Sequence, residues 1–165
     1  MNTKQPFLLF VFSFLIMFAV AQETTLPVYK RFPTVPPFKI IKVPDSVVYK
    51  KEELKKKKAT MVIIFSPDCD HCQMATKDLL ANAGLFKKVQ IIMASSSPYE
   101  SILQFYKEYA IAQHPNIIMG MDQGYFFGTF YNITNFPSIF LYDKKGVFVQ
   151  KFEGSVPFST IALSL

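Results

Sequence analysis

The sequence predicts an α/β protein built as a sandwich around a mixed β-sheet. Two apolar runs rich in β-branched residues, 61–65 and 89–93, are typical of strands buried on both faces. A segment with helical periodicity follows each run. Two further strands joined by a hairpin signal lie near the C-terminus, so the sheet is expected to combine parallel and antiparallel strands.

The first buried strand, 61–65, leads into a helix predicted over residues 69–83. Four of its positions share one stripe at helical spacing and are expected to face inward: Cys72, Ala75, Leu79 and Ala83. Gly84 follows as the stop signal.

The second buried strand, 89–93, is followed by Ser97-Pro98-Tyr99-Glu100, which fits a capping box with proline at the first helical position. This pattern predicts a helix that runs to about residue 110. Its inward face is expected to consist of Tyr99, Ile102, Leu103, Tyr106 and Ala110.

The rest of the chain predicts shorter elements. These are strands at 116–119, 138–142 and 147–152, a weaker aromatic-rich helix at 122–131, and a short helix within 155–165. Residues 143–146, with the sequence DKKG, give a clear hairpin signal between the last two strands.

The first 21 residues have the pattern of a secretory signal peptide. Lys4 supplies a basic start, Phe7–Val20 is apolar except for Ser13, and Ala19-Val20-Ala21 fits a cleavage site. The apolar run is shorter than the about 20 residues of a transmembrane helix. We therefore expect an exported protein in a periplasmic or other extracytoplasmic location, without stable membrane insertion. Retention of the leader as an anchor is the alternative.

Residues 22–37 contain four prolines and are predicted to form an extended linker without a core of its own. The domain proper is expected to span 38–165. It begins with a short hairpin of two strands, 38–43 and 46–49, with a turn at Pro44-Asp45.

Much of the formal net charge of +6 comes from a lysine-rich run, residues 50–58. Contact with nucleic acid or with an anionic membrane is one interpretation of this run. A solvated connection ahead of the first buried strand is the interpretation that we favour, and no nucleic-acid partner is expected.

Cys69 and Cys72 are the only two cysteines of the chain. A disulfide between them closes a loop with two intervening residues, so it removes little entropy from the unfolded chain and is a poor structural staple. Structural zinc requires four ligands, usually in two separated pairs, and His71 and His114 are the only histidines. No metal site is therefore expected.

The position of the cysteine pair, at the junction between a buried strand and the following helix, favours disulfide exchange. The unpaired N–H groups and macrodipole of a helix start favour negative charge at Cys69, whereas Cys72 faces inward one turn later. Cys69 is the expected nucleophile that forms a mixed disulfide with a substrate, and Cys72 is expected to resolve it. We expect the reductive direction, although the residues alone do not choose between the two directions.

Three neighbouring side chains are expected to tune this chemistry. Protonated His71 would stabilise the Cys69 thiolate and the reduced form, whereas Asp68 and Asp70 would oppose it by charge repulsion. A helix cap is the alternative role of Asp68, and an ordinary exposed side chain is the alternative for His71.

The motif CDHC after a buried strand, with NFPSIFLYDKKG some sixty residues later, resembles the thioredoxin fold. Within that fold the chain is similar to the exported TlpA/ResA-like thiol–disulfide oxidoreductases over about residues 38–154. The resemblance implies a three-layer sandwich with a mixed central sheet and an α/β insertion at about 97–119. It also implies that Pro137 is cis and lies against Cys69, and that the backbone of Phe136 pairs with an extended substrate peptide.

Three positions depart from the family pattern. No tryptophan precedes the pair, Ile63 occupies the place of the buried aspartate of thioredoxin, and Ala75 occupies the place of a glutamate in ResA-like members. These differences leave the dithiol intact but remove support for a specific role in cytochrome maturation.

The expected function is that of an exported thiol–disulfide oxidoreductase without a bound cofactor. Its expected partners are protein thiols or disulfides and an exported or membrane redox protein. A thiol peroxidase is one alternative, but the only arginine, Arg31, lies in the predicted linker. A non-catalytic binding or chaperone module is the other alternative, and the intact cysteine pair argues against it.

Overall fold

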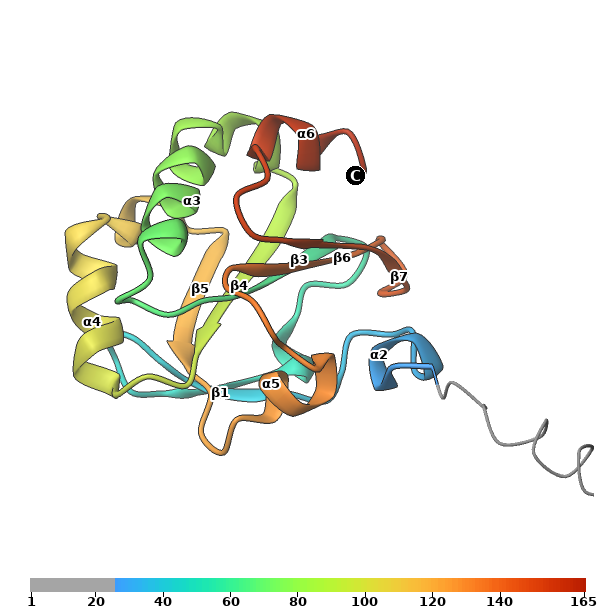
Figure 1. Cartoon of the computed structure of the whole chain (residues 1–165), viewed down its shortest axis with the longest axis horizontal. Helices are drawn as coiled ribbons and strands as arrows, with labels where there is room; N and C mark the ends of the chain where they lie inside the picture. Colours follow the sequence, from blue (N-terminus) through green and yellow to red (C-terminus); the bar gives the residue numbers. More distant parts are fainter. Residues whose placement is uncertain (1–25) are drawn as a thin grey trace, which may run out of the picture.

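The structure is a computed structural model that describes residues 26–165; the predicted signal peptide, 1–21, lies outside the described residues. Seven strands form one mixed sheet in the order β2-β1-β5-β4-β3-β6-β7 (Figure 1). They are β1 (Lys39–Lys42), β2 (Val48–Lys50), β3 (Ala59–Ile64), β4 (Val89–Ser95), β5 (Ile117–Met121), β6 (Ser138–Tyr142) and β7 (Phe148–Glu153). Strands β3, β4 and β5 run parallel, and the other neighbouring pairs are antiparallel.

Helices cover both faces of the sheet, as Figure 1 shows. The α-helices are α2 (Val28–Arg31), α3 (Asp70–Ala81), α4 (Tyr99–Glu108), α5 (Phe126–Tyr131) and α6 (Phe158–Ala162), and short 3₁₀ turns lie at Lys51–Glu53, Ala83–Phe86 and Ile111–Gln113. Helices α3, α4 and α6 share one apolar core with the sheet, and α2 and α5 share the other. The predicted three-layer α/β sandwich with a mixed sheet and a short N-terminal hairpin is confirmed.

Strand β3 lies between β4 and β6 and supplies both cores. Met61 and Ile63 point into the core beneath α3, whereas Val62 and Ile64 point into the core beneath α5, because side chains alternate along a strand. A strand with two buried faces favours an unbroken apolar run, which residues 61–64 supply, and the one polar residue of β3, Thr60, accepts a hydrogen bond from the Gln90 side chain.

Several element boundaries differ from those predicted. Helix α3 ends at Ala81, two residues earlier than expected, and α5 begins at Phe126 rather than at residue 122. The reason for the late start of α5 is that Asp122 to Gly124 form a turn, with Gly124 at a φ of +87°. In α4 the buried residues are Ile102 and Phe105, and Phe105 was not in the predicted inward stripe.

The predicted linker, 22–37, is the main correction to the expected fold. The described part of this segment forms helix α2, and its Tyr29 is 7% exposed in the core beneath α5. The Tyr29 ring packs edge-on against Phe140 and Phe148, at centroid distances of 5.4 and 5.3 Å. Residue Thr34 forms a bridge with Val147. The prolines suggested an extended chain, but the aromatic side chain at 29 completes a face of the sheet that α5 alone leaves open.

Replacement of Tyr29 by alanine should lower the free energy of unfolding by about 2–4 kcal/mol, because the change leaves a cavity among three aromatic rings. Urea denaturation followed by circular dichroism measures this. Phe32→Ala is the matched control, since Phe32 is 58% exposed, and it should change stability by less than about 0.5 kcal/mol. Equal stability of the Tyr29→Ala variant and the parent protein would restore the linker interpretation.

Candidate active site

The two cysteines lie at the junction of β3 and α3. The backbone N–H of Phe65 still donates to Ala94 O on β4, at 3.1 Å, and the chain then leaves the sheet. Cys69 is the N-cap of α3, and its Sγ accepts a hydrogen bond from the backbone N–H of Cys72 at 3.3 Å. This donor is one of the N–H groups that a helix start leaves without a partner, so it stabilises negative charge on the Cys69 sulfur. Both cysteines are free thiols.

The two thiols have different surroundings. Cys69 is partly exposed, whereas Cys72 is 1% exposed in the core beneath α3. Burial, together with the adjacent Cys69 sulfur, raises the pKa of the Cys72 thiol well above its usual range. At neutral pH Cys72 is therefore a protonated, sheltered thiol beside an accessible one.

A narrow gap beside Cys72 is lined by apolar side chains. They are Ile63, Phe65, Ala75, Leu79, Met93, Pro137 and Phe158, together with Thr76. No carboxylate is among these lining residues, and Ile63 stands there as the sequence comparison with thioredoxin implied. Thr76 does not face Cys72 as a proton acceptor, because its hydroxyl donates to the Cys72 carbonyl oxygen at 2.8 Å.

The loop before β6 lies against the exposed thiol. The Phe136–Pro137 peptide bond is cis, as the family resemblance implied, and Phe136 O is 4.0 Å from Cys69 Sγ. Pro137 is buried, and its carbonyl oxygen accepts from Gly154 N–H at 2.9 Å, which ties the loop to the end of β7. The Phe136 ring is 36% exposed beside the thiol. The structure thus brings Cys69, Cys72, Phe136 and Pro137 together.

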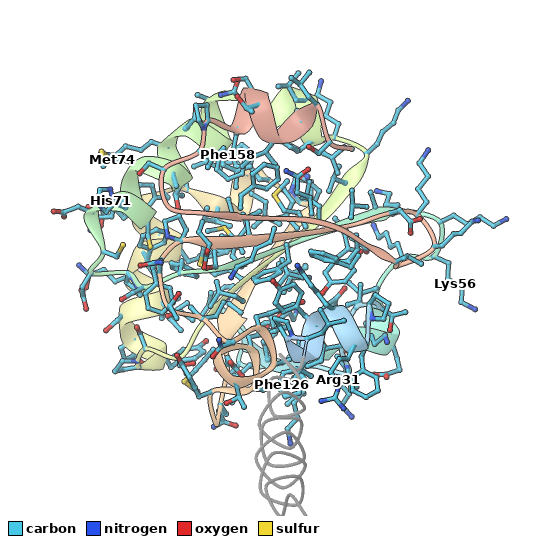
Figure 2. All side chains as sticks on the ribbon, turned by 45° about the vertical axis from the view of Figure 1, so that its right-hand side comes forward. Arg31, Lys56, His71, Met74, Phe126 and Phe158 are labelled. Atoms are coloured by element: carbon cyan, nitrogen blue, oxygen red, sulfur yellow. The ribbon has the colours of Figure 1, made fainter. Side chains whose placement is uncertain are left out.

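His71 lies on the outer side of the first turn of α3, and Figure 2 shows it at the surface with Met74. Its Nδ1 is 3.2 Å from the hydroxyl of Ser155, which lies in the loop after β7. No local pattern predicts this pair, because 84 positions separate the two residues and only the folding of the chain after β7 brings them together.

Asp68 and Asp70 are both exposed beside the cysteine pair. The cap position of α3 belongs to Cys69, so the alternative role of Asp68 as the helix cap is wrong. Asp70 lies in the first turn of the helix, where the macrodipole favours a carboxylate.

Two further carboxylates are structural features that the prediction missed. Asp122, 3% exposed, follows β5 and accepts from the N–H groups of Phe126 and Phe127 at 3.1 and 2.9 Å. Its burial raises the pKa of the carboxyl group, and its hydrogen bonds hold the start of α5. Asp78 accepts from Phe158 N–H at 2.7 Å and so fastens α6 onto α3. An acidic residue directly after a buried strand was the available signal for Asp122.

Across residues 26–165, the side chains of His, Cys, Asp and Glu do not gather into a group of three that could hold a metal ion. None of the helices in the described part of the chain has both the length and the apolar character needed to cross a bilayer.

The sequence model of a thioredoxin-like domain matches residues 46–165. This match covers more than half of the chain, so the protein belongs to the thioredoxin-like domain family. No protein with curated annotation matches the sequence.

Three solved structures illustrate the shared fold. A secreted disulfide oxidoreductase of Mycobacterium tuberculosis, homologous to DsbE of Escherichia coli, is 14% identical with a TM-score of 0.65, over 78% of this chain and 93% of its own. StoA of Bacillus subtilis is 15% identical with a TM-score of 0.58, over 79% and 98%. The exposed lipoprotein thioredoxin Etrx1 of Streptococcus pneumoniae is 18% identical with a TM-score of 0.60, over 79% and 100%.

The difference between the thiols predicts strongly unequal reactivity. In the native dithiol protein, iodoacetamide should label Cys69 at least about 100-fold faster than Cys72 at pH 7, because Cys72 is buried and protonated. Labelling of Cys72 should rise only at pH values well above 9, since its pKa is raised. Peptide mass spectrometry after timed labelling measures both rates. In denaturant the two rates should converge, and equal rates in the native protein would contradict the description of the site.

Proposed function

We propose that the protein is an exported thiol–disulfide oxidoreductase that reduces disulfides of protein substrates with Cys69 and Cys72. The observation that supports this most strongly is the pairing of a partly exposed sulfur, held by the Cys72 N–H at 3.3 Å, with a buried thiol one turn later. Such a pair separates the attacking thiol from the resolving thiol.

The proposed reaction has two exchange steps. The Cys69 thiolate attacks one sulfur of a substrate disulfide, forming a mixed disulfide and releasing the other substrate sulfur as a thiolate that takes up a proton. The Cys72 thiol then loses its proton, and its sulfur attacks Cys69 Sγ. The mixed disulfide breaks, the second substrate sulfur leaves as a thiol, and the Cys69–Cys72 disulfide forms. Two electrons pass from the protein to the substrate.

The charges around Cys69 support the reductive direction. Among the charged side chains, Asp68 and Asp70 disfavour a thiolate by charge repulsion, and protonated His71 would add to the stabilisation that the Cys72 N–H supplies. A less stable thiolate makes the dithiol form a stronger reductant. The hydroxyl of Ser155, at 3.2 Å from His71 Nδ1, is positioned to hold the imidazole ring and so to modulate how strongly His71 stabilises the Cys69 thiolate.

The loop before β6 is the proposed binding site for substrate. Phe136 O faces Cys69 at 4.0 Å, and an extended peptide beside this backbone would bring its disulfide to the exposed sulfur. Two apolar residues near the site are exposed, Phe136 by 36% and Met74 by 52%. They suit protein substrates with apolar residues near their cysteines.

Export and an external electron donor complete the proposal. The predicted leader supports a location outside the cytosol, and the names of two structural relatives, a secreted oxidoreductase and an exposed lipoprotein, agree with it. The oxidised Cys69–Cys72 pair must be reduced again after each turnover, so an exported or membrane redox protein is the required partner.

Mixed-disulfide trapping tests the two cysteine roles. With a disulfide-containing protein such as native insulin, Cys72→Ser should accumulate a covalent complex that dithiothreitol separates, because the resolving thiol is missing. Cys69→Ser, the matched variant with one thiol left, should form at least about tenfold less complex, since Cys72 is buried and protonated. Non-reducing electrophoresis measures both. Equal trapping by the two variants would contradict the assignment.

Removal of the His71 imidazole should make the protein a stronger reductant. We expect His71→Ala to lower the redox potential by roughly 30 mV or more, because the variant loses the charge that stabilises the reduced form. A shift of 30 mV corresponds to about 1.4 kcal/mol for a two-electron couple. Ser155→Ala should shift the potential in the same direction by a smaller amount, and Ser159→Ala, at an exposed position of α6, should leave it unchanged. Equilibration with glutathione buffers measures the potential. An unchanged potential for His71→Ala would remove His71 from the proposal.

A further inference from the structure

A concentration of positive charge lies at the end of the sheet far from the cysteine pair. A hollow of about 430 Å³ there is lined by seven lysines, which we call the basic pole: Lys51, Lys55, Lys56, Lys57, Lys58, Lys144 and Lys145. The sequence separates these lysines into two groups, and the antiparallel pairing of β6 with β3 brings the turn after β6, with the second group, to the first. No aspartate or glutamate lines the hollow.

In the described part of the chain no lysine of the basic pole forms an ion pair, although the pKa of the Asp143 carboxyl group is lowered by backbone N–H donors and by the nearby charge of Lys145. The ion pairs in the described part of the chain are Lys42–Asp45 and Lys151–Glu153, and neither uses a lysine of the pole. Seven like charges around one hollow repel one another, which destabilises the fold unless an anion is bound. Such an arrangement is typical of a surface that meets a polyanion.

The lysine segment is also held in place, which a merely solvated connection does not require. Gln90, 8% exposed, accepts from Lys55 N–H at 2.8 Å and donates to Lys55 O at 3.1 Å. Its amide donates as well to the Thr60 hydroxyl at 2.9 Å. A buried side chain thus fixes the start of the loop 55–58 on the sheet, so the lysines are presented by a rigid frame.

Apolar side chains stand beside the charge. Val147, next to the hairpin turn, is 40% exposed, and Phe32, two residues before Thr34 at the hollow, is 58% exposed. Lysines flanked by exposed apolar groups match the interfacial region of a bilayer, where phosphate groups lie next to acyl chains. A polyanion that lacks an apolar region has no surface against which Val147 and Phe32 could pack.

We propose that the basic pole docks the protein on an anionic membrane surface through phospholipid headgroups. The chain passes close to this surface after α2, since residues 33–35 pair with residues 146–148 next to Lys144 and Lys145.

Docking through the basic pole sets the orientation of the dithiol. Lys58 precedes β3 and Cys69 follows it, so the six residues of β3 separate the two sites by roughly 20 Å. Figure 2 shows Lys56 and His71 at opposite ends of the molecule. The membrane-bound protein would therefore hold its cysteine pair away from the lipid, where extended peptides can reach it.

Lysine footprinting on vesicles tests this proposal with the full chain. Phosphatidylcholine vesicles with about 30% phosphatidylglycerol should slow acylation of Lys56, Lys144 and Lys145 at least about fivefold, while exposed Lys77 and Lys107 keep their rates. Pure phosphatidylcholine should protect none of them. Protection should vanish in about 1 M salt, where the Debye length is about 3 Å. Protection that is absent, or equal at all five lysines, would overturn the proposal.

Two variants with the same net charge provide the second test. The readout is the ratio of partition coefficients on anionic and neutral vesicles, because apolar residues of the leader contribute to both. The variant Lys56→Gln/Lys144→Gln/Lys145→Gln should lower this ratio by roughly 10- to 100-fold. The control Lys39→Gln/Lys77→Gln/Lys107→Gln should lower it less than about threefold.

Equal losses in the two variants would refute a localised surface. Tighter binding to a DNA duplex than to anionic vesicles, at equal phosphate concentration, would assign the pole to nucleic acid and also overturn the proposal. The inference is independent of the redox function, so a Cys69→Ser protein should show the same lysine protection.

Discussion

The burial of β3 between β4 and β6 is the constraint on which the rest of the structure depends. Because both faces of this strand are covered, its ends are fixed in the sheet, and the chain must leave at Phe65 and turn into α3. That turn makes Cys69 the cap of the helix and presents its sulfur to the helix N–H groups. The antiparallel pairing of β3 with β6 brings the Phe136–Pro137 loop to the same edge. A single strand thus assembles the candidate site from three parts of the chain.

The proposed difference in reactivity between the two cysteine thiols follows from their different surroundings in the fold. Cys69 remains accessible and receives an N–H donor, whereas Cys72 is enclosed by apolar groups and its pKa is raised by burial. The gap beside Cys72 contains Ile63 where a proton-accepting carboxylate could stand. In the proposed reaction Cys72 would therefore lose its proton as it attacks the mixed disulfide, and the departing substrate sulfur is the proposed acceptor of that proton.

Much of the fold could be predicted from the sequence, because its signals are local. The continuous apolar runs specify β3 and β4, the DKKG turn specifies the β6–β7 hairpin with Gly146 at a φ of +78°, and the cysteine spacing identifies the candidate site. What could not be predicted depends on contacts between distant segments. Tyr29 packs against Phe140, more than 100 residues away in the chain, and Ser155 reaches His71 after the end of β7. The two lysine groups meet only when β6 pairs with β3. Local sequence patterns thus predict the individual helices and strands, whereas the contacts between distant segments depend on how these elements pack.

The central claim is that Cys69 and Cys72 form a reversible two-electron couple poised for reduction. A redox titration of the full chain against defined thiol buffers, with the cysteine state read by mass after alkylation, tests it most directly. We expect one reversible transition with a tenfold change in the ratio of oxidised to reduced protein per about 30 mV, at a potential of roughly −270 mV. A potential near about −120 mV would contradict the reductive direction. The absence of any reversible transition would contradict the oxidoreductase function itself.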